Sequence, residues 1–179
     1  MKLIILDRDG VINHDSAEYI KSLEEWVPIP GSLDAIARLY HGGFRIIIAS
    51  NQSGLGRGLF SIDHLNAIHR KLARELGAQG AQLEAIFFCP HAPSANCTCR
   101  KPLPGLLNEI ADRLQVNLVG VPCVGDSWRD MESALAVGAT PILVRTGNGL
   151  NTLIDHADEL VDIPIFNDLA AATDYILAA

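Results

Sequence analysis

Short apolar runs alternate with helical patterns along almost the whole of this 179-residue chain. The apolar runs predict buried strands, and apolar residues repeated at helical spacing predict helices. Strands are expected at residues 3–7, 44–49, 83–88, 119–124, 141–144 and 160–163. Helices are expected at residues 32–41, from the N-cap Ser61 to about Leu76, and at residues 104–114, 128–137 and 167–177. The alternation predicts an α/β fold, a doubly wound, mostly parallel sheet with helices on both faces.

The length and composition limit the domain count and the partners. The chain suits one hydrophobic core, and no linker or repeat divides it, so we predict a single domain over residues 1–179. A formal net charge of −7 argues against nucleic-acid and anionic-membrane partners. No apolar run could span a membrane, and the start of the chain does not resemble a secretory signal, so we expect a cytoplasmic protein. We expect a monomer, because no amphipathic stretch is left over for an interface.

Two carboxylates follow the first predicted strand directly, in the string Asp7-Arg8-Asp9-Gly10. Parallel sheets keep their chemistry at the carboxyl ends of strands, so we expect Asp7 and Asp9 at the active edge. Slightly different surroundings can give neighbouring carboxyls different protonation states, and then one can attack while the other moves a proton. The alternative is an acidic, solvated loop after a strand.

The ends of the next three strands carry polar residues of complementary kinds. They are Ser50, Asn51 and Gln52 after the second strand, Arg100 and Lys101 after the third, and Asp126 and Asp130 after the fourth. Together with the first strand end they supply a nucleophile, a proton shuttle, a hydroxyl, a fixed cation and a metal ligand. Phosphoryl transfer needs such a set, because it depends on positioning and charge stabilisation. The two long loops, residues 11–31 and 89–103, are also expected to be functional.

Three cysteines and a histidine lie close together in the second long loop, as Cys89-x-His91 and Cys97-x-Cys99. Soft ligands set in two close pairs suit a tetrahedral structural zinc ion. The loop has almost no apolar residue to fold around, so a metal would replace a core there. The alternative is a set of scattered surface thiols beside a solvated histidine.

Four motifs in order make the chain similar to a known superfamily. The strings are LIILDRDG, IIIASNQSG, CRKPLPG and GDSWRD, and on them residues 1 to about 145 resemble the haloacid-dehalogenase-like (HAD) phosphohydrolases. The resemblance implies a Rossmann-like core with the first strand at its centre. It implies that Asp7 is the nucleophile that becomes an aspartyl phosphate and that Asp9 is the general acid and base. Ser50 and Lys101 would hold the phosphoryl oxygens.

The same resemblance implies one magnesium ion. Its ligands would be the carboxylates of Asp7 and Asp126 and the main-chain carbonyl of Asp9, and such oxygen ligands suit a hard cation. Asp130 would support the metal or Lys101 from behind. Stabilisation of the helix dipole by an acidic residue near the N-terminus is an equal alternative for Asp130.

The Cys/His loop directly before Arg100-Lys101-Pro102 resembles that of the heptose-bisphosphate phosphatases and of their relatives, the histidinol-phosphate phosphatases. These enzymes lack a large cap domain, and no insertion here is long enough for one. The resemblance implies removal of the 7-phosphate of D-glycero-D-manno-heptose 1,7-bisphosphate, a step toward the heptose of lipopolysaccharide core or surface glycans. Histidinol phosphate, in histidine biosynthesis, is the alternative substrate.

Cations near the motifs predict a highly anionic substrate, such as a sugar bisphosphate. By resemblance Arg100 binds the distant phosphate, and Arg57 is the next candidate. Arg8 could instead be a structural ion-pair partner, and Arg129 could simply occupy a helix start. The other expected substrate contacts are Asp15, Tyr19, Asn51, Gln52 and Ser53.

Three other functions fit the sequence less well than a phosphatase that acts on a small phosphorylated sugar. A zinc-stabilised binding module would not require the complete set of Asp7, Asp9, Lys101 and Asp126. A phosphotransferase or mutase usually needs a lid that excludes water, and the loops here are short. A polynucleotide 3′-phosphatase shares the core, but the acidic charge and the lack of a basic, aromatic stripe count against it.

Overall fold

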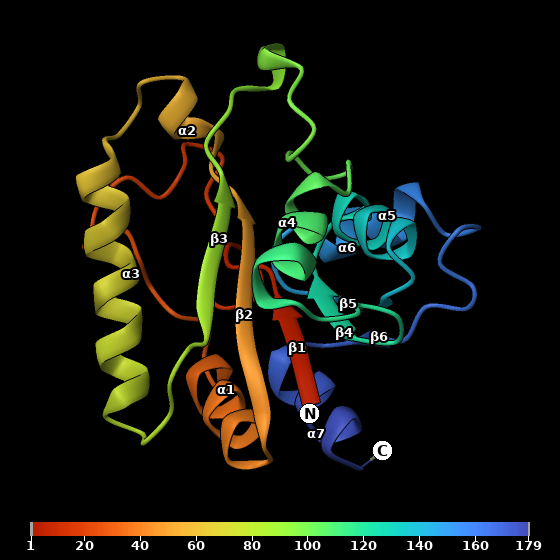
Figure 1. Cartoon of the computed structure of the whole chain (residues 1–179). Coiled ribbons are helices and arrows are strands. Elements are labelled where there is room, and N and C mark those ends of the chain that lie inside the picture. Colours follow the sequence, from red (N-terminus) through yellow and green to blue (C-terminus); the bar gives the residue numbers. More distant parts are fainter. Residues whose placement is uncertain (1, 179) are drawn as a thin grey trace.

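Six parallel strands form the centre of the molecule, in the order β3-β2-β1-β4-β5-β6 (Figure 1). The computed structural model describes residues 2–178. The strands are β1 (Lys2–Leu6), β2 (Phe44–Asn51), β3 (Ala85–Cys89), β4 (Pro122–Gly125), β5 (Thr140–Val144) and β6 (Ile165–Phe166). The strand order changes direction at β1, so its carboxyl end lies at the switch point where α/β sheets bind ligands. The doubly wound fold and the central first strand are confirmed.

Helices cover both faces of the sheet because β1 is apolar on both sides. Ile4 and Leu6 belong to one buried cluster, and Leu3 and Ile5 belong to another. The first cluster packs on α1 (Ser32–His41), α3 (Ile62–Gly77) and α7 (Leu169–Ala178). The second packs on α4 (Gly105–Leu114) and α5 (Trp128–Ala136). Such two-sided burial is typical of a parallel strand and holds the residues after β1 rigidly in place.

Local signals placed most helix ends correctly. Helix α1 has the expected bounds, and the Ser61 hydroxyl accepts a hydrogen bond from the His64 amide at 3.3 Å. In return His64 Nδ1 accepts from the Ser61 amide at 3.4 Å, which completes a capping box at the start of α3. Three short elements were not predicted: α2 (Ser53–Gly56), the 3₁₀ turn η1 (Pro93–Ala95) and α6 (Gly149–Asp155).

Two predicted strands need correction. Residues 160–163 form turns, and the sixth strand is instead Ile165–Phe166. Leu160 and Ile163 are apolar because they pack on Met131 and Leu143, so core contact rather than sheet pairing explains the pattern. The fourth strand begins only at Pro122, since Val119 is 70% exposed.

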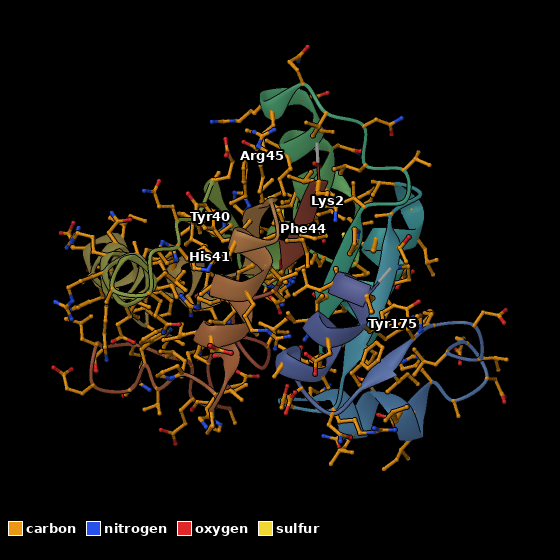
Figure 2. The ribbon with its side chains drawn as sticks, turned by 90° about the horizontal axis from the view of Figure 1, so that it is seen from below. Lys2, Tyr40, His41, Phe44, Arg45 and Tyr175 are labelled. Atoms are coloured by element: carbon orange, nitrogen blue, oxygen red, sulfur yellow. The ribbon has the colours of Figure 1, made fainter. Side chains whose placement is uncertain are left out.

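The two ends of the sheet differ in their loops. The segments after β1 and β3 leave the carboxyl edge as long loops, and the one after β3 projects beyond the sheet (Figure 1). Figure 2 shows the opposite end, where Lys2, Phe44 and Tyr175 are labelled and the Lys2 Nζ lies 5.2 Å from the Phe44 ring centroid. Across the described residues, no helix combines the length and apolar character needed to cross a membrane.

Candidate active site

Lys101 places a buried positive charge beside Asp7. Its Nζ lies 3.1 Å from Asp7 Oδ1 and 2.5 Å from Asp130 Oδ1, and it donates to the Ala49 carbonyl at 2.8 Å. The second Asp130 oxygen accepts from the Ser127 hydroxyl at 2.6 Å and from the Ser127 amide at 3.1 Å. Asp130 therefore holds Lys101 and caps the start of α5 at the same time, which unites two of the alternatives weighed from the sequence.

The carboxylates at this edge are crowded and have altered proton affinities. Burial raises the pKa of Asp7 to about 7, although Lys101 pulls it down. Burial, with the charges of Asp130 and Asp7, raises the pKa of Asp126 to about 8. For Asp130 burial acts in the same direction, but the Lys101 ammonium outweighs it and the pKa falls below its usual value. The Lys101 ammonium thus stabilises mainly the charged form of Asp130. The charged forms of Asp7 and Asp126 are not fully compensated by it.

A second cation fits the donor set. Carboxylate oxygens of Asp7, Asp126 and Asp130 lie within 4.8 Å of one another. Asp7 Oδ1 is buried and, despite its ion pair with Lys101, accepts no hydrogen bond from the described residues 2–178. Carboxylate oxygens are hard ligands of the kind that Mg²⁺ prefers.

Asp126 is fixed by a segment that the sequence analysis did not single out. The Asn148 amide donates to Asp126 Oδ2 at 2.7 Å, and the Thr152 hydroxyl donates to the Asp126 carbonyl at 3.0 Å. Gly10 and Gly147 both have positive φ, and a Cβ at either would lie 2.0–2.1 Å from the same Oδ2. The polar, glycine-containing turn directly after β5 was the signal that could have revealed this support.

Several side chains expected on the substrate also hold the site together. Asn51 pairs with the backbone of Lys101, accepting from its amide at 3.1 Å and donating to its carbonyl at 3.0 Å. Gln52 Nε2 donates to Asp9 Oδ2 at 2.9 Å and to the Ser50 hydroxyl at 2.8 Å. Arg8 is fully buried and donates to both Asp9 oxygens at 2.9 Å, which agrees with the ion-pair alternative.

A cavity of about 380 Å³ brings the sequence-predicted residues together. The residues expected to carry the chemistry line it, namely Asp7, Asp9, Ser50, Lys101, Asp126 and Asp130. The expected substrate contacts also line it, namely Asp15, Tyr19, Asn51, Gln52, Ser53, Arg57 and Arg100. The cavity wall further includes Arg129, which the sequence left as a residue of a helix start. Burial, together with the charges of Arg129 and Arg57, lowers the pKa of Arg100. This concentration of cations suits a second anionic group of a ligand.

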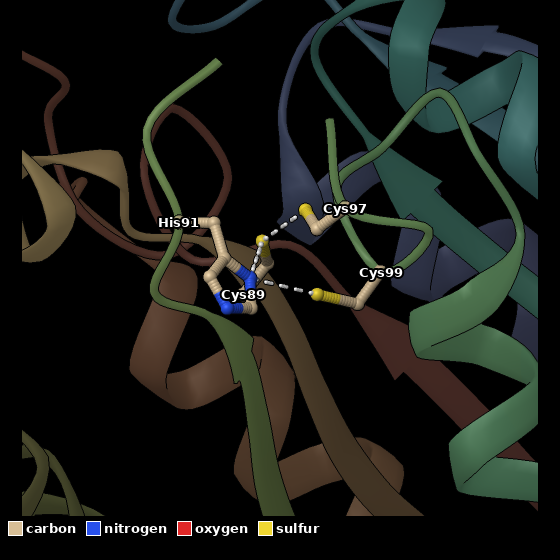
Figure 3. Close-up of side chains that lie close together, drawn as sticks. All are labelled: Cys89, His91, Cys97 and Cys99. Carbon is tan, nitrogen blue, oxygen red and sulfur yellow. Dashed lines mark hydrogen bonds between the residues drawn. The ribbon is translucent and has the colours of Figure 1, made fainter. Parts of the chain in front are cut away.

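The Cys/His loop brings together a second group of side chains that could hold a metal ion (Figure 3). Cys89 Sγ lies 3.6 Å from Cys97 Sγ and 3.6 Å from His91 Nδ1, which in turn lies 3.3 Å from Cys99 Sγ. A tetrahedral ion with Zn–S bonds of about 2.3 Å separates its ligands by roughly 3.8 Å. All four donors therefore fit one zinc ion. They would fill its four coordination positions, so no position would stay open for catalysis.

We expect the purified protein to contain about one equivalent of zinc, and Cys97→Ser to lower the unfolding temperature by roughly 10 °C, since the loop lacks its own core. Metal analysis and thermal unfolding test this. Cys123→Ala is the control, because it removes a thiol outside the loop without placing a hydroxyl in the second core cluster, to which Cys123 belongs. Equal unfolding temperatures for the two variants would contradict a structural zinc.

The fold and the site define a HAD-like hydrolase. A family model described as HAD-hydrolase-like matches residues 98–172, and one described as polynucleotide kinase 3 phosphatase matches residues 2–127. The chain is 51% identical to D-glycero-beta-D-manno-heptose-1,7-bisphosphate 7-phosphatase from Bordetella bronchiseptica, over 99% of this chain and 98% of that one. The enzyme of the same name from Pseudomonas putida is 54% identical, over 96% and 97%.

A solved structure is similar along the whole chain. The D,D-heptose 1,7-bisphosphate phosphatase of B. bronchiseptica, complexed with magnesium and phosphate, superposes with a TM-score of 0.96 over 99% of both chains. The chain belongs to the D-glycero-beta-D-manno-heptose-1,7-bisphosphate 7-phosphatase family of HAD-like hydrolases. Both resemblances inferred from the motifs are confirmed.

Proposed function

We propose that the protein removes the 7-phosphate of D-glycero-β-D-manno-heptose 1,7-bisphosphate, a step toward the heptose of lipopolysaccharide or other surface glycans. The observation that carries the proposal is the identity of 51–54% over nearly the whole chain to relatives of that name. The cavity agrees with it, because a reactive carboxylate beside Lys101 faces the same space as Arg57, Arg100 and Arg129. A bisphosphate would place one phosphate beside Lys101 and the other beside the arginines.

The proposed reaction has two steps. An Asp7 oxygen attacks phosphorus, the bond to the sugar oxygen breaks, and Asp9 gives that oxygen a proton. Asp9 then takes a proton from water, which attacks the aspartyl phosphate and releases inorganic phosphate and free Asp7. Lys101 and the Ser50 hydroxyl hold the phosphoryl oxygens in both steps.

We propose that Asp7, Asp126 and the main-chain carbonyl of Asp9 hold the magnesium ion. When bound, the ion neutralises charge between the carboxylates and the phosphoryl group. Lys101 also pairs with Asp130, so its single positive charge does not neutralise all the carboxylates of the site, and a second positive charge can be accommodated. Asp126 keeps its orientation through the Asn148 amide.

Metal-free protein should lose stability as pH rises from about 4 to about 8, between the unfolded and the folded pKa values of two buried carboxyl groups. The pKa of Asp7 is about 7 and that of Asp126 about 8, both above 3.8, so the folded state binds more protons in this window. Burial lowers the pKa of His69 from 6.5 to about 4, so this side chain contributes the opposite trend over the lower part of the window, where the two carboxyl groups together outweigh it. Thermal unfolding at several pH values measures the effect.

Asp126→Asn should flatten this decline, and magnesium should reverse it in the unsubstituted protein. The exposed Asp174→Asn is the matched control. A decline that is the same in both variants would contradict the assignment to the metal-site carboxylates.

A side-by-side rate comparison tests the substrate. The compounds are the two heptose-bisphosphate anomers, histidinol phosphate and an oligonucleotide 3′-phosphate, each with magnesium. We expect the β anomer to be cleaved fastest at its 7-phosphate. Faster turnover of histidinol phosphate or of the oligonucleotide would refute the substrate and leave the two-step chemistry intact.

Arg100→Met should raise KM for the bisphosphate by about tenfold to a hundredfold, because a charge-assisted contact to the distant phosphate is lost. Arg129→Met should act in the same direction by a smaller factor, since this side chain is exposed. KM for the 7-monophosphate should change little in either variant. Arg113→Met, on an exposed turn of α4 paired with Glu109, is the control. Equal effects on both substrates would contradict a second phosphate site.

We also propose that residues 1–179 act as one monomeric phosphatase domain in the cytoplasm. One sheet runs through the described residues 2–178. The cysteines are free thiols, and a reducing compartment would keep them available to zinc. Sedimentation at working concentrations checks the oligomeric state, and a dimer would refute this part alone.

A further inference from the structure

The Asp9 carboxylate is held by four N–H groups, two on each oxygen. Arg8 Nε and the Asn13 amide donate to Oδ1 at 2.9 and 2.8 Å. Arg8 Nη2 and Gln52 Nε2 donate to Oδ2, both at 2.9 Å. A carboxylate offers about four acceptor positions, so these donors determine its orientation, and one of them must give up its position when Asp9 carries a proton.

The Asn13 amide can donate to Asp9 because another side chain fixes which way it points. The Trp26 indole N–H donates to Asn13 Oδ1 at 3.0 Å, so the amide nitrogen must face the opposite way. That nitrogen donates to Asp9 and, at 2.9 Å, to the His14 carbonyl. The flipped amide would place two N–H donors against each other and leave Asp9 one donor short.

Trp26 and Asn13 lie in the core rather than at the cavity wall. Trp26 is 1% exposed and Asn13 is fully buried. Lys71 of α3 donates to the Trp26 carbonyl at 3.2 Å, and its Nζ lies 5.0 Å from the indole ring centroid. Neither Trp26 nor Asn13 lines the 380 Å³ cavity. The indole therefore has a rigid setting and no route to a ligand, so an effect on the reaction would have to pass through Asp9.

We propose that Trp26 and Asn13 are a pair of positioning residues that set the orientation of the Asp9 carboxyl for proton transfer to the leaving group. The inference rests on the proposed role of Asp9. It gives the long first loop a second task besides lining the cavity with Asp15 and Tyr19. A tilt of the carboxyl group weakens proton transfer, because that step requires the donor within hydrogen-bonding distance of the ester oxygen.

Trp26→Phe tests the pair, because it keeps an aromatic ring and removes the N–H. Two substrates are compared in single turnovers with enzyme in excess: a primary alkyl phosphate that the enzyme cleaves, such as the heptose bisphosphate, and p-nitrophenyl phosphate. We expect alkyl ester cleavage to slow by about tenfold, with little change in the enzyme concentration that gives the half-maximal rate. Release of nitrophenolate should change less than twofold, because this good leaving group departs without a proton.

Two results would overturn the proposal. If both esters slow equally, the pair is merely structural, and if neither slows, the indole hydrogen bond has no role in the reaction. Trp128→Phe is the matched control. The ring of Trp128 stacks on that of His156, with the centroids 5.0 Å apart, and Trp128 does not line the cavity. A failed substrate proposal is recognised separately, since the comparison works with any alkyl phosphate the enzyme cleaves.

Two further measurements keep the test decisive if Trp26→Phe is unstable. Asn13→Leu has a similar volume and removes the donor to Asp9, so it should give the same contrast between the esters. In a protein that keeps Trp26 and Asn13, Asp9→Asn should shift the indole N–H resonance of Trp26, because the Asn13 amide joins Trp26 to residue 9 by hydrogen bonds. An unmoved resonance would refute the connection.

Discussion

Asp7→Asn should reduce phosphate release by about 10,000-fold or more, because an amide cannot form the covalent intermediate. The fold should persist, since the two side chains are nearly isosteric. Burial raises the pKa of Asp7 to about 7, so a neutral group there avoids a desolvation cost. The metal-free variant should therefore unfold at the same temperature as the parent protein or at a higher one. Phosphate assays and thermal unfolding measure the two effects.

A matched substitution separates chemistry from charge. Asp174→Asn removes an exposed carboxylate that pairs with Arg38 and should leave turnover within twofold. In the unsubstituted protein, acid quenching during turnover of a phosphorus-labelled substrate should leave the label on the peptide that contains Asp7. Label on another residue, or full activity in Asp7→Asn, would refute the nucleophile.

Lys101→Met should lower turnover by about a thousandfold and destabilise the fold by about 3–5 kcal/mol at pH 8. The substitution leaves Asp7 and Asp130 buried without their shared cation, only 5% of which is exposed. The loss of stability should be smaller at pH 5, because carboxyl groups without a cation take up protons more readily. Denaturant unfolding at the two pH values measures this difference.

Two further variants make this prediction specific. The double variant Lys101→Met/Asp130→Asn should recover much of the stability but none of the activity, because it removes one unpaired charge without restoring the phosphoryl contact. Lys2→Met, which removes an exposed lysine at the opposite end of the sheet, should change neither. Recovery of activity in the double variant would argue against a phosphoryl contact by Lys101.

The sheet could be predicted from sequence because a parallel sheet leaves strong local signals. The apolar run before Asp7 is long enough for one strand, and the polar residue after it marks the carboxyl edge. The same signals predict that Ser50, Lys101 and Asp126 lie together at this edge, and all three line the cavity. The signal was misread at Leu160, because burial against a helix and burial in a sheet select the same apolar side chains.

Amide side chains were harder to assign. Asn51 and Gln52 follow a strand and line the cavity as expected, but their hydrogen bonds also fix Lys101 and Asp9. A sequence shows that such a side chain is polar and does not show which partner it meets. The role of Trp26 was harder still to predict, because its only local signal is that of a core residue.

The sequence by itself determined which chemical groups reach the active edge and which four residues can hold zinc, because strand ends and ligand spacing are local properties. Only the tertiary structure decided how those groups are oriented: Lys101 shared with Asp130, Asp126 wedged between Gly10 and Gly147, and Asp9 held through Asn13. These contacts join segments that are distant in the chain or buried beneath the site. Their hydrogen-bond directions depend on packing, which no local pattern encodes.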